Sequence, residues 1–174
     1  MNFSNETINL SELPEFEAAA LSKPHPNYWK VISINLLCFM LFLALSIFLI
    51  LYINEWLNLK VIFLTSSVFT GLGLFLFYVY RMAFKRRGYA LRSLDIQYKS
   101  GLIAEKTTIV PINRIQHVAL NEGLFSRMYG LASLQIYTAS GNEGDIQIKG
   151  IELESAQRMK THLINQIAAQ TNNN

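Results

Sequence analysis

Two long apolar stretches dominate the first half of the chain. Residues 31–53 and residues 61–80 contain no charged side chain. Each stretch reaches about 20 residues, which is the length that a helix needs to cross roughly 30 Å of hydrocarbon. Only residues 54–60 separate them, so the two helices are expected to run antiparallel as a transmembrane hairpin over 31–80.

A transmembrane hairpin explains these stretches better than a globular core or a signal peptide does. As core helices of a globular protein, they would need a larger chain around them, because both would have to be covered on all sides. As a cleaved signal peptide, the first stretch begins too late and is longer than the usual apolar region of such a peptide. The single cysteine, Cys38, lies in this stretch, which excludes an intrachain disulfide framework.

The pattern changes to a period of two after residue 88. Residues 94–98 alternate as in a strand, residues 99–101 predict a turn, and two further strand segments follow at 102–104 and 105–110, before Pro111 interrupts the ladder. In the next segment, 112–120, Ile115 turns inward together with either Val118 or His117, depending on a possible bulge. The clearest strand pair is 131–138 with 145–149, joined across a glycine-containing loop.

Helical periodicity returns at the end of the chain. Between residues 152 and 169 the apolar side chains recur at spacings of three and four, which predicts an amphipathic helix that covers a face of the sheet. These side chains are Ala156, Met159, Leu163, Ile164 and Ile167. Residues 171–174 are expected to form a tail. A shorter amphipathic helix is predicted over residues 11–21, within the segment 1–30.

Composition and charge set the orientation of the hairpin. The chain is 51% hydrophobic and 16% charged, which is too apolar for an ordinary soluble domain. Four basic side chains crowd the exit of the second stretch, whereas the connector holds only Lys60, offset by Glu55. We therefore expect a multi-pass protein of the inner cell membrane with both termini in the cytoplasm. The four basic side chains are Arg81, Lys85, Arg86 and Arg87, in a juxtamembrane linker over residues 81–87.

Trp29 and Trp56 flank the first apolar stretch, where amphipathic rings anchor a helix at the membrane surface. From residue 81 onward the chain has 12 basic and 7 acidic side chains, so this part carries 12 − 7 = +5. Such a charge suits a domain held against anionic lipids. Binding of nucleic acid is not expected, because the strands lack a basic stripe with exposed aromatic side chains.

The polar residues give no sign of catalytic chemistry. His25, His117 and His162 lack metal-ligand spacing, and no nucleophile motif or phosphate-binding loop is present. We expect no cofactor, no metal and no enzymatic activity. Arg114 and Arg127 stand among apolar residues, where each either ties loop carbonyls or a carboxylate such as Glu122, or faces a partner.

Several segments together resemble the bacterial pleckstrin-homology-like (PH-like) domain of the YdbS-like membrane proteins. They are the opening at 89–101, the sequence Ile-Val-Pro at 109–111 with Arg-Ile-Gln-His-Val at 114–118, the sequence 126–131, and Ile-Tyr-Thr-Ala at 136–139. The resemblance implies that residues 88–170 form a curled antiparallel sheet or barrel of about seven strands, capped by the C-terminal helix. It also implies a non-catalytic binding module, with a larger protein carrying several such domains as partner.

Two functions follow as hypotheses. The first is a membrane-anchored interaction module that docks itself, as a homo-oligomer, or a sibling PH-like membrane protein, with Arg114, Gln116, Arg127 and Tyr129 as candidate interaction residues. The alternative is a sensor of anionic lipid headgroups. Eukaryotic PH domains that bind phosphoinositides concentrate basic residues near the first hairpin turn, where this chain offers Lys99 and Lys106. Two solvated lysines are poorly suited to clamp a multiply charged headgroup.

Overall fold

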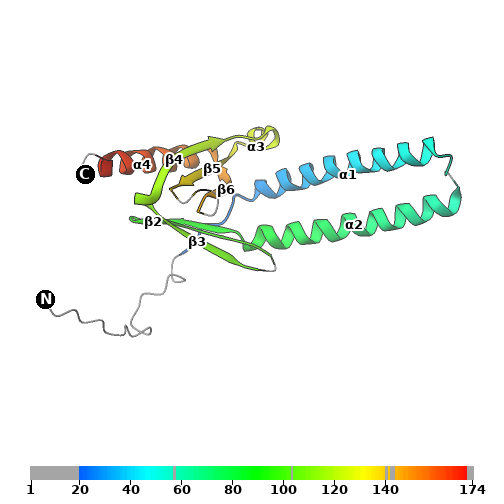
Figure 1. Ribbon diagram of the computed structural model, residues 1–174, viewed down its shortest axis with the longest axis horizontal. Coiled ribbons are helices and arrows are strands. Elements are labelled where there is room, and N and C mark those ends of the chain that lie inside the picture. The colour runs from blue at the N-terminus through cyan, green and yellow to red at the C-terminus, as the bar shows by residue number, and fades with distance from the viewer. Residues whose placement is uncertain (1–19, 57, 103, 140, 142–143, 172–174) are drawn as a thin grey trace, which may run out of the picture.

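The chain folds into a helical hairpin and a strand-rich domain at one end of it, as the computed structural model shows (Figure 1). The structure describes residues 20–56, 58–102, 104–139, 141 and 144–171. The hairpin consists of α1 (Asn27–Ile53) and α2 (Leu59–Arg86). Both helices are long and apolar enough to cross a membrane, and their apolar windows are not buried inside the chain. The alternative of two core helices is therefore wrong.

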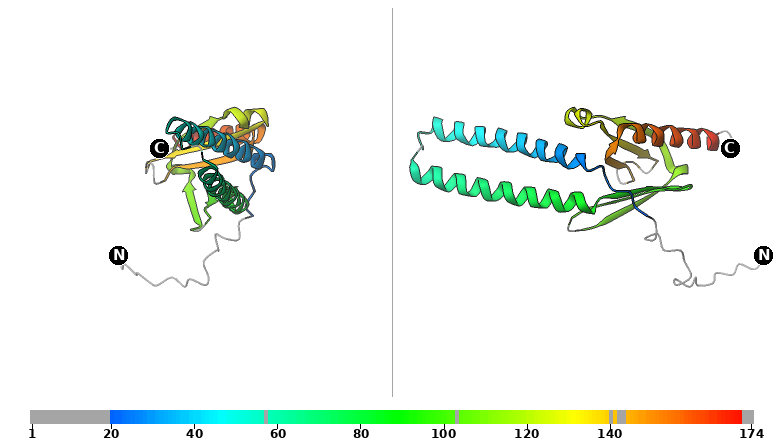
Figure 2. Two further views of the ribbon diagram at one scale, coloured as in Figure 1. Left: turned by 90° about the vertical axis from the view of Figure 1, so that its right-hand side faces the viewer. Right: turned by 180° about the vertical axis from the view of Figure 1, so that it is seen from behind.

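The two helices lie side by side and project away from the domain in Figure 1 and in the right-hand view of Figure 2. At about 1.5 Å per residue, the 27 residues of α1 span about 40 Å, which matches a bilayer with its headgroup regions. Asn58 caps α2 by accepting a hydrogen bond from the Val61 N–H at 2.9 Å. The helix then continues through the basic segment to Arg86.

Polar side chains inside the hairpin bond to their own helices. The side chain of Asn35 donates to the Val31 carbonyl at 2.8 Å, and the hydroxyl of Thr70 donates to the Ser66 carbonyl at 2.9 Å. Such bonds to the preceding turn satisfy these groups without a partner helix. The small residue Gly73 does lie against α1, where an added Cβ would be 3.8 Å from the Met40 sulfur.

Six strands make up the domain in the described part of the chain, and they form two separate antiparallel sheets. The first sheet has the order β1-β2-β3 and the second the order β4-β5-β6. Their bounds are Gly88–Leu91, Asp95–Ser100, Lys106–Pro111, Ile115–Asn121, Leu131–Thr138 and Ile146–Glu152. The expectation of about seven strands in one curled sheet or barrel is corrected by this arrangement. The short 3-10 turn η3 (Ile112–Arg114) separates β3 from β4. Pro111 still pairs with Asp95 as the last residue of β3, so it ends the ladder where the sequence predicted an interruption.

The first hairpin turn falls later than the sequence indicated. Lys99 and Ser100 still belong to β2, where they pair with Thr107 and Lys106 of β3. Gly101 begins the turn with a φ of +120°, and a side chain at this position would overlap the carbonyl oxygen of Ala104. The need for a residue with positive φ places the start of the turn at Gly101 and not at Lys99.

A bulge in β4 decides which side chains face the core. The register shifts between Ile115 and His117, so that Ile115 and Val118 are both buried. His117 lies outside and stacks on Tyr137, with ring centroids 4.2 Å apart. Of the two arrangements that the sequence allowed, the bulged one with Val118 inward is confirmed.

One core joins the two sheets. Ile96 and Val110 from the first sheet pack with Leu134, Ile136 and Ile148 from the second. The helix α4 (Leu153–Thr171) lies along the second sheet (Figure 1), and its Ala156 and Leu163 are fully buried in this core.

The two amphipathic helices expected from the sequence differ in outcome. The helix over Glu152 to Ala169 is confirmed, but Ile164 of its predicted stripe is 45% exposed. The predicted helix over residues 11–21 lies mostly outside the described residues, and Ala20 and Leu21 are not helical.

Candidate functional site

The segment that precedes α1 ties the hairpin to both sheets. Ser22 forms a two-way β-bridge with Tyr89 of β1, with N···O distances of 2.8 and 2.9 Å. Three residues later, the His25 N–H donates to the carbonyl of Gly150 in β6 at 2.8 Å. Because this short segment contacts one strand of each sheet, it holds the membrane helices and the domain in a fixed relation.

Tyr28, in the first turn of α1, fits against the backbone of β6. Gly150 has a φ of +80°, and a side chain there would overlap the ring of Tyr28. Tyr28 is buried together with Val31 and Leu131. Phe84 of α2 packs against the same cluster, with its ring centroid 6.3 Å from that of Tyr28. The junction between hairpin and domain is therefore packed like a small core.

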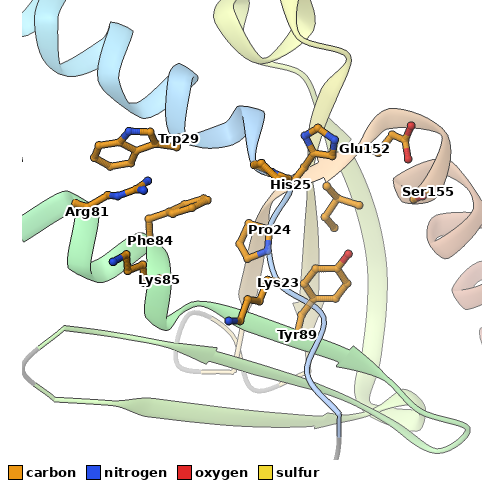
Figure 3. A pocket seen from close by; sticks show the side chains of 13 residues that line it. Lys23, Pro24, His25, Trp29, Arg81, Phe84, Lys85, Tyr89, Glu152 and Ser155 are labelled. Carbon is orange, nitrogen blue, oxygen red and sulfur yellow. The ribbon is translucent and has the colours of Figure 1, made fainter.

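Beside this cluster lies an open groove of about 880 Å³, which we call the junction groove (Figure 3). Residues of the N-terminal segment, both membrane helices, β1, β6 and α4 line it. Its cations are Lys23, Arg81 and Lys85, and its acid is Glu152. The groove thus has positive side chains at the level where the helices leave the domain.

Trp29 and Phe84 form the helical wall of the junction groove, and Phe77 lies next to Trp29 outside the groove lining. The Arg81 guanidinium lies 4.8 Å from the ring centroid of Trp29. The ring of Trp29 meets Phe77 edge-on at 5.2 Å and lies 5.9 Å from Phe84. On the domain side, burial raises the pKa of Tyr89 above its ordinary value.

Of the residues predicted to lie at the membrane surface, Trp29, Arg81 and Lys85 meet in this groove. Arg86 instead donates a 2.6 Å hydrogen bond to the Leu102 carbonyl and lies 3.7 Å from Glu105, so it ties α2 to the β2–β3 turn. The pKa of Glu105 is lowered, mainly by the hydrogen bond and charge of Lys99.

The remaining two of these residues lie elsewhere. Arg87 lines a smaller pocket with Tyr28 and Lys149 on the other side of the junction. Trp56 is exposed in the connector at the far end of the hairpin, where an anchor for the opposite membrane surface was predicted.

The structure separates the four candidate interaction residues into two pairs. Arg114 lies in η3 and Gln116 at the start of β4, and both are exposed. Arg127 and Tyr129 lie in and just after α3 (Leu124–Met128), beyond the other end of β4. At about 3.3 Å per residue, the seven residues of β4 span about 20 Å, and the two pairs lie toward its opposite ends.

The two arginines of these pairs are exposed, and in the part of the chain that the structure describes neither guanidinium makes a hydrogen bond or an ion pair. The predicted tie to Glu122 is absent there. A partner-facing role stays a prediction for both pairs. The pair after β4 lies near the membrane helices, where Lys30 of α1 is 5.8 Å from the ring centroid of Tyr129.

Sequence reasoning missed the apolar surface of α3. Leu124 is 75% exposed and Met128 is 74% exposed, and their spacing of four places them on one face of the helix. Figures 1 and 2 show α3 beside the first turns of α1, at the hairpin end of the domain. Three apolar residues, Leu124, Phe125 and Met128, stand between Gly123 and Gly130, and the sequence does not show which of them the fold covers. Phe125 packs against the cluster that contains Tyr28, whereas Leu124 and Met128 do not.

The junction groove gave no such signal, because its lining residues come from segments far apart in the sequence. Among the described residues, no group of three or more histidine, cysteine or acidic side chains gathers closely enough to hold a metal ion.

Comparisons with known proteins agree with this architecture. A family model described as bacterial PH domain matches residues 13–167. The transmembrane protein YdbS of Bacillus subtilis (strain 168), described as UPF0699, is 27% identical over 138 residues, which cover 76% of this chain and 81% of that protein. The UPF0699 transmembrane protein YdbT of the same organism is 31% identical over 77 residues, which cover 44% of this chain but only 16% of YdbT.

No solved structure gives a significant match. The two apolar helices and the transmembrane relatives together identify the chain as a membrane protein.

Proposed function

Since this chain belongs to the bacterial PH domain family, we propose that it is a membrane-anchored, non-catalytic module that docks a sibling PH-like membrane protein. In this proposal the hairpin crosses the membrane twice, and both termini lie in the cytoplasm. The cations at the domain end of α2 support this orientation, since Lys and Arg accumulate on cytoplasmic flanks.

The exposed apolar face of α3 is the observation that carries the docking proposal. Leu124 and Met128 leave most of their side-chain area uncovered, although apolar side chains of this size gain about 1.5–3 kcal/mol each when fully buried. Arg127 stands beside Met128, and arginine and methionine are both enriched in protein interfaces relative to the rest of the surface. A partner that covers α3 would bury this face.

Two considerations favour a sibling membrane protein as that partner. The face lies at the hairpin end of the domain, where a second membrane-anchored chain is confined to the same plane. YdbS and YdbT come from one organism, and the match to YdbT covers only 16% of that protein's length. A short PH-like chain and a much longer one with a similar segment therefore occur together in that organism.

Crosslinking in cells tests the proposal. A photo-activated crosslinking residue replaces Arg127, and the matched control carries it at Arg158, an exposed arginine of α4. We expect position 127, but not position 158, to capture a second membrane protein with a bacterial PH domain. The double variant Leu124→Ala/Met128→Ala is expected to reduce this capture by about tenfold, because the apolar contact is lost.

Three outcomes contradict the docking proposal. They are equal capture from both positions, capture of lipid alone at position 127, and a lone monomeric chain in crosslinked cells. Capture of a second copy of the chain, without a sibling, shows that the partner is this protein itself and overturns the sibling part of the proposal.

A further inference from the structure

Beyond the docking function, we propose that the junction groove binds the phosphate of an anionic phospholipid headgroup through Lys23, Arg81 and Lys85. The groove is distinct from α3 and from the first hairpin turn, because other segments line it. Figure 3 shows Arg81 and Lys85 on α2 and Lys23 on the N-terminal segment, around one opening.

The charge of the groove fits an anion. Its lining holds three formal cations and one acid, Glu152, which gives 3 − 1 = +2 with His25 neutral. Among the described residues, the side chains of Lys23, Arg81 and Lys85 make no hydrogen bond or ion pair, and the Arg81 guanidinium lies over the ring of Trp29. All three cations therefore have N–H groups left to donate to phosphate oxygens.

Neutral donors complete the polar lining. Ser155 of α4 and Tyr89 of β1 line the groove with hydroxyl groups. The Nδ1 atom of His25 accepts a hydrogen bond from the Asn27 N–H at 3.2 Å. A neutral His25 ring then carries its proton on Nε2, which makes this atom a further donor.

The position of the groove points to a lipid and not to a soluble phosphate. Trp29 and Phe84 form an aromatic wall where α1 and α2 reach the domain, and an amphipathic tryptophan ring favours the depth where headgroups meet acyl chains. A phospholipid in the adjacent leaflet can place its phosphate among the cations and its upper acyl carbons against this wall. A free phosphate ion would leave the aromatic wall uncovered.

Native mass spectrometry of the full-length protein in detergent tests this site, with added phosphatidylglycerol, phosphatidylcholine, phosphatidylethanolamine or inorganic phosphate. We expect the wild-type chain to retain phosphatidylglycerol in preference to the other three. The double variant Lys23→Gln/Lys85→Gln removes two cations and is expected to weaken phosphatidylglycerol binding by about 10- to 30-fold.

Two matched variants separate a built site from general charge. Lys23→Arg/Lys85→Arg keeps both charges and is expected to bind like the wild type. Lys60→Gln/Lys160→Gln removes the same number of cations, from the connector end of the hairpin and from α4, and is also expected to bind like the wild type. Both lysines lie outside the groove lining.

The proposal is overturned if Lys23→Gln/Lys85→Gln binds phosphatidylglycerol like the wild type, or if the control Lys60→Gln/Lys160→Gln loses as much. Equal retention of either zwitterionic lipid overturns the role of net charge. Equal binding of inorganic phosphate overturns the lipid as ligand. None of these results contradicts the docking proposal for α3, because the test of that proposal measures which protein is crosslinked at position 127.

Discussion

At the scale of single residues, Gly150 and Tyr28 fix how the hairpin meets the domain. Gly150 needs its positive φ of +80°, and its missing side chain leaves the space that the Tyr28 ring fills. The Gly150 carbonyl also accepts the hydrogen bond from the His25 N–H, so a backbone contact and a ring contact meet at this one residue. Gly130 is a natural comparison, because its φ is +64° and nothing lies within 4 Å of an added Cβ.

Replacing Gly150 by alanine is expected to destabilise the junction more than replacing Gly130. Both variants lose about 1–2 kcal/mol by placing a side chain in the left-handed region, and Gly150→Ala adds about 1–3 kcal/mol for the overlap with Tyr28. Urea unfolding in detergent measures both. The additional destabilisation by Gly150→Ala should become smaller in a chain that also carries Tyr28→Ala, because the overlap with the ring is removed. An equal effect of the two glycine variants would show that the Tyr28 contact carries no energy.

At the scale of elements, α4 is held by one face. Ala156 and Leu163 are fully buried against the second sheet, whereas the neighbouring Ile164 remains 45% exposed. A helix of this composition has little reason to be stable alone, because most helical stability in proteins comes from packing of the apolar face. The sheet in turn needs the helix to cover Leu134 and Ile136.

Leu163→Ala is expected to destabilise the domain by about 2–5 kcal/mol, because it removes buried carbon atoms and leaves a cavity. Ile164→Ala is the matched control, with an expected loss under about 1 kcal/mol, since the isoleucine is partly solvated already. The free energy of unfolding of the full chain in detergent measures the difference. Similar losses for both variants would show that Ile164 is as buried as Leu163, against the burial seen in the structure.

At the scale of the whole molecule, the hairpin and the domain form one body. The segment from Ser22 to His25 bonds to β1 and β6, and Arg86 bonds to the β2–β3 turn. These contacts set the depth of the junction groove and of the α3 face relative to the membrane helices. Both proposed surfaces depend on that depth.

Reporter fusions test the orientation that this depth requires. A reporter enzyme that works only in the cytoplasm is expected to be active when fused after Arg87 and inactive when fused after Asn58 in the connector. A reporter that works only outside the cytoplasm should give the reverse pattern. The reason is the excess of basic side chains at the domain end of the hairpin. Activity of the second reporter after Arg87 would refute the cytoplasmic placement of the domain.

Local patterns predicted much of the fold, because some features depend only on neighbouring residues. The uncharged stretches predicted the hairpin, and the alternation at 131–138 and the spacing of Ala156 and Leu163 predicted the later strand and helix. The turn that starts at Gly101 was placed too early in the sequence. The short strand β1 was missed, since a strand of four residues carries too little pattern.

The sequence by itself determined which segments avoid water, where the positive charges lie and which residues repeat with the period of a strand or helix, because these are properties of contiguous residues. Only the tertiary structure decided that the strands divide into two sheets, that Lys23 and Arg81 share a groove, and that Leu124 and Met128 stay uncovered. Such features arise from contacts between segments distant in the chain, and one sequence holds no local signal for them.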